Sequence, residues 1–433
     1  MKRFLEFMER YFVPVAGRIG SQRHLVAVRD GFVSIMPLIL AGSVAVLLNN
    51  TLFKWVPALG ILTGINGNVW WGTFAIMTLV VVFSTGYNLA KSYSVDALAA
   101  GLISVASFIT ITPQAHGEAG WGYIHWGYLN ATGLFTGIIV ALIATEIFVK
   151  LMKKKLTIKM PDNVPPAVGR AFAAVIPGIA ALYLFGIVGH IITNAGANSL
   201  YDIIYNLIQK PLQGFSQGLG SAIILAVFLN VFWFFGLHGG NIFDPIVNSL
   251  YLPALEANAS AVQQGVAAAN IVTKSFYDSF VHIGGCGATL ALILAIYIAA
   301  RKRDEYKQVA KLSAPAGLFN INEPMMFGLP IILNPILLIP FILVPGILTF
   351  IAYIATASGL VPMTYVQIPW ITPVGISGFL ATGGNIMGGL LSIINFAVAV
   401  LIYLPFVKLA DNMAAESGAS SYETGKKSVS KSV

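Results

Sequence analysis

Residues 317–335 read GLFNINEPMMFGLPIILNP, an apolar run that contains a single carboxylate, Glu323, between Asn322 and Pro324. Pro324 has no amide hydrogen to donate and favours the first position of a helix, so the run predicts a helix that starts directly after the carboxylate. A charged side chain at the centre of a bilayer costs about 2.5–3.5 kcal/mol on insertion scales and rarely faces lipid. In such a setting Glu323 requires a structural or a chemical reason.

The composition indicates that this run belongs to a membrane protein. The 433 residues are 57% hydrophobic and only 10% charged, and the mean hydropathy of +0.80 is far above that of an ordinary soluble protein. Apolar runs long enough to cross a bilayer as helices, which takes about 20 residues, recur between residues 31 and 409. The alternating pattern of membrane-spanning strands is absent. The sequence therefore predicts an all-α, polytopic membrane protein.

The apolar runs do not divide evenly between the basic segments that flank them. Four runs precede a basic joint at residues 150–170, but only three clear runs lie between it and the next joint, at 301–311. Both joints have the positive charge typical of the cytoplasmic side, so three crossings between them do not fit. We expect the stretch from His238 to Asp278 to add a further crossing or to enter and leave on one side as a hairpin. The block that starts at 317–335 poses a similar problem, and broken or re-entrant helices are the natural explanation in both. In transporters such interrupted helices mark the binding site. The expected runs lie near residues 31–53, 71–90, 95–112, 130–150, 171–193, 220–237, 279–300, 331–357, 366–382 and 386–409.

The net charge of +8 is not spread as a stripe that would bind nucleic acid, so no nucleic-acid partner is expected. Basic residues gather at the ends of apolar runs, and the positive-inside rule assigns those ends to the cytoplasm. The N-terminus, both joints and the C-terminus are therefore predicted to be cytoplasmic. The basic residues are Arg18, Arg23, Arg29, Lys150, Lys153, Lys154, Lys155, Lys159, Arg301, Lys302, Arg303, Lys426 and Lys427.

We expect three regions along the chain. The first, residues 1–165, opens with MKRFLEFMERYFVPVAGRIG (1–20), which lacks the features of a removable signal peptide and has the amphipathic pattern of a helix lying in the headgroup layer. The second, residues 166–410, holds both polar intramembrane motifs. The third, residues 411–433, has the composition of a disordered tail.

A second polar motif, WFFGLHGGNIFDP at residues 233–245, places a glycine pair and an asparagine directly after His238. Glycines such as Gly239 let the backbone approach a ligand closely, and Asn241 adds a donor and an acceptor. Both interrupted regions thus contain a polar motif. Together with the motif around Glu323, the cluster favours one pocket for a polyhydroxylated ligand.

Four further residues are candidates for the same pocket. Asn322 adjoins the carboxylate, and Trp233 and Trp370 are suitable apolar faces for a sugar ring. Each tryptophan is also consistent with a membrane-interface belt. Asn385 lies among glycines that suit close helix packing equally well.

The two central residues have alternative interpretations. Glu323 can accept a hydrogen bond from a substrate hydroxyl and, when burial raises its pKa, take that proton. The alternative is a structural carboxylate that caps a broken helix. His238 can bind the same substrate or be an ordinary buried histidine beside aromatic residues.

The lone cysteine, Cys286, excludes a disulfide framework and a thiolate metal cluster, and we expect neither metal nor cofactor. We interpret Cys286 as a small packing residue. An intramembrane hydrolase is disfavoured because the sequence shows no nucleophile with its base and no metal-ligand spacing.

FNINEPMMFGLPIILNP and WFFGLHGGNI resemble the membrane-embedded IIC permease of the bacterial phosphoenolpyruvate-dependent sugar phosphotransferase system, in its lactose, cellobiose and diacetylchitobiose branch. The similarity extends over nearly the whole chain. It implies a homodimer with about ten transmembrane helices per protomer plus two re-entrant hairpins, in which residues 1–165 make the dimer contact and the second region moves a disaccharide by an elevator motion.

The resemblance also implies roles for two residues. Glu323 and His238 would bind the sugar hydroxyl that is to be phosphorylated, and Glu323 would accept its proton when a soluble IIB protein, itself supplied by IIA, delivers a phosphoryl group from its phosphocysteine. Cys286 lacks a soluble, electropositive setting and is a poor phosphocysteine candidate, so the donor is expected on a separate chain. Diacetylchitobiose or cellobiose is favoured over lactose on overall likeness.

The competing hypothesis is an ion-coupled secondary sugar transporter. Such carriers use carboxylates within the membrane to bind a proton or Na⁺. The carboxylates available for this role are Glu323, Asp244, Asp96 and Asp278.

Overall fold

The computed structural model describes Arg18 and residues 21–114, 122–161, 164–196, 199–234, 238–329, 331 and 335–429. Within these ranges the ordered elements are all helical, and no β-strand is present. The predicted all-α class is therefore confirmed. The helix expected in the headgroup layer, residues 1–20, lies almost entirely outside the described residues.

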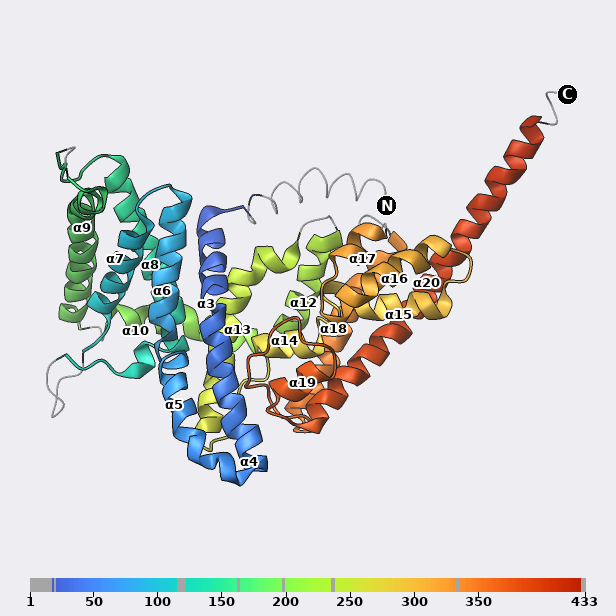
Figure 1. The fold of residues 1–433 in the computed structure, drawn as a ribbon, viewed down its shortest axis with the longest axis horizontal. Helices are drawn as coiled ribbons and strands as arrows, with labels where there is room; N and C mark the ends of the chain where they lie inside the picture. The colour runs from blue at the N-terminus through green and yellow to red at the C-terminus, as the bar shows by residue number, and fades with distance from the viewer. Residues whose placement is uncertain are drawn as a thin grey trace.

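The first part of the chain forms a bundle around α6, which packs against α3, α7 and α8 (Figure 1). Gly86 and Gly101 let α6 and α7 approach closely, because a Cβ on either would collide with side chains of the facing helix. Asp96 starts α7 by accepting a hydrogen bond from the Ala99 amide at 3.0 Å. The helices are α3 (Arg23–Leu47), α4 (Phe53–Trp55), α5 (Thr63–Trp71), α6 (Met77–Ser92), α7 (Ala97–Ile111), α8 (Leu134–Lys153) and α9 (Pro166–Asn194), with short turns η2 (Leu48–Leu52), η3 (Pro57–Leu62), η4 (Phe74–Ile76), η5 (Trp126–Tyr128) and η6 (Ala131–Gly133).

The second part packs α15, α18 and α20 together around a core that includes Phe341, Leu348 and Tyr403. Its elements are α10 (Leu200–Ile204), η7 (Tyr205–Gln209), α11 (Lys210–Ser216), α12 (Leu219–Phe234), α13 (Gly239–Gln263), α14 (Lys274–Phe280), η8 (Cys286–Ala288), α15 (Thr289–Ala299), α16 (Asp304–Leu318), α17 (Glu323–Gly328), α18 (Pro335–Ala357), α19 (Ile376–Ala381) and α20 (Ile386–Val429). The last of these, red in Figure 1, projects from the body and includes most of residues 411–433.

Six helices within the described ranges are long and apolar enough to cross a membrane, and six of the expected runs coincide with them. The run expected at 220–237 is instead one arm of a pair, Leu200–Ser216 and Leu219–Trp233, that bends by 83°. The runs near 95–112 and 279–300 form shorter apolar helices. The six are Arg23–Trp55, Pro57–Ser92, Ala131–Lys153, Pro166–Asn194, Ile336–Ala357 and Ile386–Asn412.

The span expected at 366–382 is wrong. The chain there is irregular until the six-residue helix α19 begins at Ile376. Pro369 and Pro373 lack amide donors, so an uninterrupted helix through this segment would lose backbone hydrogen bonds. This irregular segment instead contributes residues to the cavity described below.

The two interrupted regions also differ in form. Residues 238–278 contain a 25-residue helix, α13, with Pro245 and Pro253 inside it. In the second region a helix was expected directly after Glu323, and α17 starts one residue earlier, at Glu323 itself, with Pro324 in its first turn.

The two parts meet where α3 packs against α13, near the middle of Figure 1. Farther along α13, the buried carboxylate of Glu256 accepts a hydrogen bond from the Ala131 amide at 3.1 Å. These contacts hold α13 between the first bundle and the rest of the second part.

Candidate functional site

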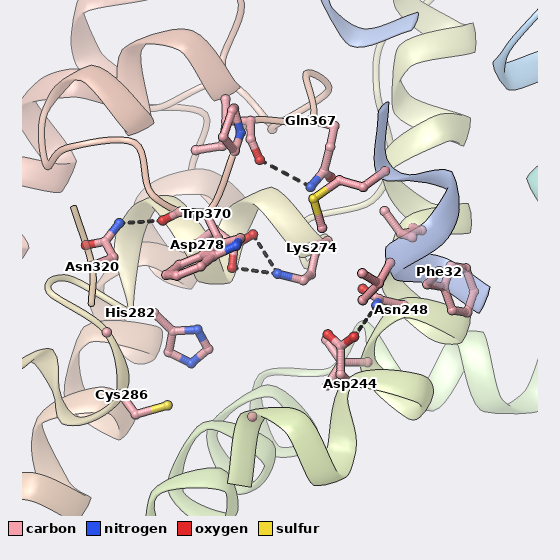
Figure 2. Close-up of a pocket in the computed structure, with 18 of the residues that line it drawn as sticks. Phe32, Asp244, Asn248, Lys274, Asp278, His282, Cys286, Asn320, Gln367 and Trp370 are labelled. Carbon is pink, nitrogen blue, oxygen red and sulfur yellow. Dashed lines mark hydrogen bonds and ion pairs between the residues drawn. The ribbon is translucent and has the colours of Figure 1, made fainter. Parts of the chain in front are cut away.

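A cavity of about 390 Å³ lies between α3 and the second part of the chain. Its walls come from one face of α3, the start of α13, α14, the loop at 282–286, the turn at 320–323 and the irregular segment 367–370. Figure 2 shows side chains from these elements directed toward a common space. This volume is within the range of small-ligand pockets.

His238 and Glu323 both line this cavity, and Nε2 of His238 lies 3.8 Å from Oε1 of Glu323. The histidine precedes α13, and its ring lies against Trp233, with ring centroids 4.4 Å apart. Glu323 is the first residue of α17. Both side chains keep part of their surface exposed, 38% and 46%. The fold thus brings together the two motifs that the sequence analysis singled out.

Two asparagines fix the turn that carries Glu323. Nδ2 of Asn320 donates to the carbonyls of Trp370 and Thr372 at 2.6 and 3.0 Å, while its Oδ1 accepts from the Gly284 amide at 2.6 Å. Nδ2 of Asn322 donates to the Cys286 carbonyl at 3.3 Å. The carboxylate is therefore anchored to two other cavity walls.

The remaining predicted residues divide into two groups. Asn322 and Trp370 line the cavity, and Trp370 is 46% exposed. Trp233 is only 2% exposed and lies behind His238. The space at Gly239 is closed by the Leu229 carbonyl, so the cavity residue of the glycine pair is Gly240.

Two further predicted residues, like Trp233 and Gly239, have no described place in the cavity lining. Asn385 caps the start of α20 by accepting a hydrogen bond from the Met387 amide at 2.9 Å and is absent from the cavity lining. The side chain of Asn241 lies outside the described residues.

A charged wall faces the cavity opposite α3. Nζ of Lys274 lies 2.7 and 2.6 Å from the two carboxylate oxygens of Asp278, and these side chains are 17% and 5% exposed. Nearby, Asp244 accepts a hydrogen bond from Asn248 at 2.9 Å. Figure 2 shows both pairs. Sequence reasoning named the two aspartates only for the rival hypothesis and missed Lys274, although its spacing of four from Asp278 is a signal for a pair on one helix face.

Other cavity residues were also missed. Asn320 is the first asparagine of the quoted FNINEP motif, but only Asn322 was singled out. Gln367 and His282 line the cavity as well, and Nε2 of His282 is buried without a hydrogen-bond partner among the described residues. No pattern marks these two residues, since they come from segments without helical periodicity.

The described residues contain no group of three or more His, Cys, Asp or Glu side chains arranged to hold a metal ion. The cavity wall contains the half-exposed carboxylate of Glu323, the imidazole of His238, several side-chain amides, a buried ion pair and the aromatic ring of Trp370. This mixture of acceptors and donors suits a neutral ligand with several hydroxyl groups.

Comparison with known proteins supports the family that the sequence motifs resemble. A sequence model of the family described as "Phosphotransferase system, EIIC" matches residues 29–345. The cellobiose-specific EIIC component of Geobacillus stearothermophilus is 39% identical over 96% of both chains. The oligo-beta-mannoside-specific EIIC component of Bacillus subtilis (strain 168) is 38% identical over 97% of both.

A solved structure extends the likeness to three dimensions. The transporter ChbC, the IIC component of an N,N'-diacetylchitobiose-specific phosphotransferase system, superposes with a TM-score of 0.89 at 38% sequence identity, covering 95% of this chain and 99% of the other.

Proposed function

Because this chain belongs to the EIIC family of the phosphotransferase system, and is thus a sugar permease of that system, we propose that it binds a disaccharide, carries it into the cytoplasm and presents it there to a separate IIB protein for phosphorylation. The resemblance found in the sequence is confirmed. Which sugar is carried and how it is handled are our proposals.

The observation that supports this function best is the pair of His238 and Glu323 in one cavity, 3.8 Å apart. One sugar hydroxyl between them can donate to the carboxylate and accept from the imidazole. Trp370, half exposed at the same cavity, supplies an apolar face for a sugar ring.

The proposed reaction needs little from the permease beyond position and a proton acceptor. The hydroxyl oxygen forms a bond to phosphorus, the bond from phosphorus to the IIB cysteine sulfur breaks, and the electron pair of that bond leaves on sulfur. The hydroxyl proton passes to the carboxylate of Glu323. His238 holds the oxygen in place, so it is a binding and positioning residue for the same step.

The substrate proposal rests on the relatives. Their names specify cellobiose, oligo-beta-mannosides and diacetylchitobiose, whereas the lactose-specific EIICB components of Staphylococcus aureus are only 27% identical. We favour diacetylchitobiose or cellobiose for this chain.

Several features of the wider assembly remain proposals. The homodimer through residues 1–165, the elevator motion of 166–410, the re-entrant hairpins and the cytoplasmic location of both termini follow from the family resemblance and from the distribution of basic residues. IIA would act only through IIB. Basic joints on the cytoplasmic side would favour an anionic, phosphorylated partner.

An ion-coupled sugar carrier is the second candidate, and the charged wall of Asp244, Lys274 and Asp278 is the observation that favours it. The source of energy for uptake distinguishes the two candidate functions. Proteoliposomes would receive labelled disaccharide outside, with or without IIB, IIA and a phosphoenolpyruvate-driven phosphate supply inside. We expect labelled sugar phosphate only with the complete set. Accumulation of unmodified sugar in response to an ion gradient alone would reject the phosphotransferase proposal.

A further inference from the structure

Arg29 lies on the face of α3 that lines the cavity. Phe32, Val33, Met36 and Leu40 of this helix contribute to the cavity wall. Side chains three and four residues apart share one helix face, so Arg29 is the next position of this stripe toward the helix N-terminus. Arg29 itself does not line the cavity, but it continues the stripe beyond Phe32, toward the side that the basic residues assign to the cytoplasm.

The charge of Arg29 reaches the cavity residues of the second part. Its guanidinium makes only a minor electrostatic contribution at His238 and Asp244, both of which line the cavity. The Arg29 side chain is 30% exposed. It is thus partly open to solvent.

The guanidinium also has unused hydrogen-bonding capacity. Nε and Nη2 donate to the same oxygen of the neighbouring Asp30, at 3.0 and 2.8 Å. An arginine has five N–H donors, and among the described residues the other three have no protein partner. Because Asp30 is itself 43% exposed, this pair is weak and can open to another anion.

A planar guanidinium with free donors is the side chain best suited to bind the oxygens of a phosphoryl group in a bidentate manner. The alternative interpretation is a basic anchor at the membrane surface, which any cation would serve. That alternative does not explain why Arg29 continues the cavity stripe.

We propose that Arg29 binds the phosphoryl group at the cytoplasmic mouth of the cavity, both while it passes from the IIB phosphocysteine to the sugar hydroxyl and in the phosphorylated product. This inference rests on the proposed function. As the S–P bond breaks and the O–P bond forms, negative charge is spread over the phosphoryl oxygens, and a fixed positive group stabilises that charge. Glu323 still accepts the hydroxyl proton.

One consequence concerns the two parts of the chain. Arg29 comes from the first part, whereas His238 and Glu323 come from the second. The transfer site is then complete only while α3 lies beside α13, as it does here. Phosphorylation would be confined to that arrangement, so sugar in another arrangement of the two parts would not be modified.

The test compares Arg29→Gln and Arg29→Lys with wild type and with Arg23→Gln as a matched control. Arg23 lies on the same helix but is not three or four residues from any member of the cavity stripe, and its guanidinium stacks 4.0 Å above the Tyr93 ring. Three quantities are measured on purified protein: the Kd for the unphosphorylated disaccharide, the Kd for its phosphate, and the rate of transfer from phospho-IIB at saturating partner.

For Arg29→Gln we expect an unchanged Kd for the free sugar, a Kd for the sugar phosphate weakened about tenfold or more, and a transfer rate reduced about 10- to 100-fold. Arg29→Lys should give intermediate values for the Kd of the sugar phosphate and for the transfer rate, since lysine keeps the positive charge but lacks the planar pair of donors of a guanidinium. Arg23→Gln should match wild type in all three.

Equal binding of the sugar phosphate by wild type and Arg29→Gln would overturn the inference, as would an equal loss for the free sugar, which would indicate a damaged pocket. A matching loss of transfer in Arg23→Gln would assign the effect to surface charge. If wild type itself transfers no phosphoryl group from phospho-IIB, the proposed function falls and this inference with it. If wild type transfers and Arg29→Gln transfers equally well, only the inference falls.

Discussion

Nε2 of His238 lies 3.8 Å from Oε1 of Glu323, although the first residue ends the connection from α12 to α13 and the second begins α17. Neither element alone makes a binding site. Their proximity depends on how helices α15 to α18 pack next to the turn at Asn320–Glu323. It also depends on the loop at 282–286, in which the Gly284 amide donates a hydrogen bond to Asn320. The site is therefore a product of tertiary structure, and variants can separate its chemistry from its support.

Glu323→Gln tests the chemistry. The amide keeps the size of the side chain and can still hydrogen-bond a hydroxyl, so sugar affinity should fall by no more than about tenfold, equivalent to about 1.4 kcal/mol. Phosphoryl transfer should collapse, because the amide cannot accept the proton. Binding and transfer are measured on the same purified protein. Glu305→Gln, at a side chain 66% exposed, is the control, and unchanged transfer in Glu323→Gln would show that another group is the base.

The buried pair of Lys274 and Asp278 predicts a non-additive effect on stability. Removing one partner leaves an uncompensated charge, so Lys274→Met should lower the free energy of unfolding by about 3–5 kcal/mol. The double variant Lys274→Met/Asp278→Asn should recover a large part of that loss. Thermal unfolding in detergent is the measurement.

The control for this cycle is the pair of Arg303 and Glu305, 3.7 Å apart, whose carboxylate side chain is 66% exposed. Glu305→Gln should change stability by less than about 1 kcal/mol. Additive losses at Lys274 and Asp278 would contradict the prediction and indicate that the two charges do not depend on each other.

The sequence alone predicted the helical class, six of the long apolar spans and, to within one residue, the helix start at Glu323, because these depend on local composition and on one proline. It also paired the motifs of His238 and Glu323 correctly, since both interrupt apolar runs. The failure at 366–382 arose because average hydropathy outweighed Pro369 and Pro373, which end helical hydrogen bonding there.

The rest of the cavity could not be read from the sequence. Phe32 and Met36 look like any residues of an apolar span, and only the packing of α3 beside α13 makes them cavity walls. Trp233 and Asn385 show the reverse case: residue type suggested ligand contact, but the fold places the first behind His238 and uses the second as a helix cap.

Gly285→Ala should weaken sugar binding indirectly, through the loop that contacts the turn carrying Glu323. Gly285 has a φ of +90°, and a Cβ there would lie 2.8 Å from the Asn320 carbonyl oxygen and 2.9 Å from Asn322. Since the turn that carries Glu323 would have to shift, we expect sugar affinity to fall about tenfold or more. Equilibrium binding of labelled disaccharide measures this.

Gly359→Ala is the matched control, because Gly359 also has a positive φ, +78°, but open space where the Cβ would lie. It should show the backbone strain of a left-handed residue without loss of sugar affinity. Equal affinities in Gly285→Ala and wild type would show that the turn tolerates the added methyl group.

Glu256 on α13 joins the two parts of the chain through a hydrogen bond, which leads to a prediction for stability. Its side chain is 3% exposed, and Oε2 accepts the Ala131 amide at 3.1 Å. Glu256→Ala leaves that buried amide without a partner and should lower the free energy of unfolding by about 1–3 kcal/mol. Glu256→Gln keeps an acceptor of the same size, so its thermal unfolding should stay close to wild type. If both variants lose stability equally, the negative charge rather than the acceptor holds α13 to the segment before α8, and the hydrogen bond is not the reason for a carboxylate at this position.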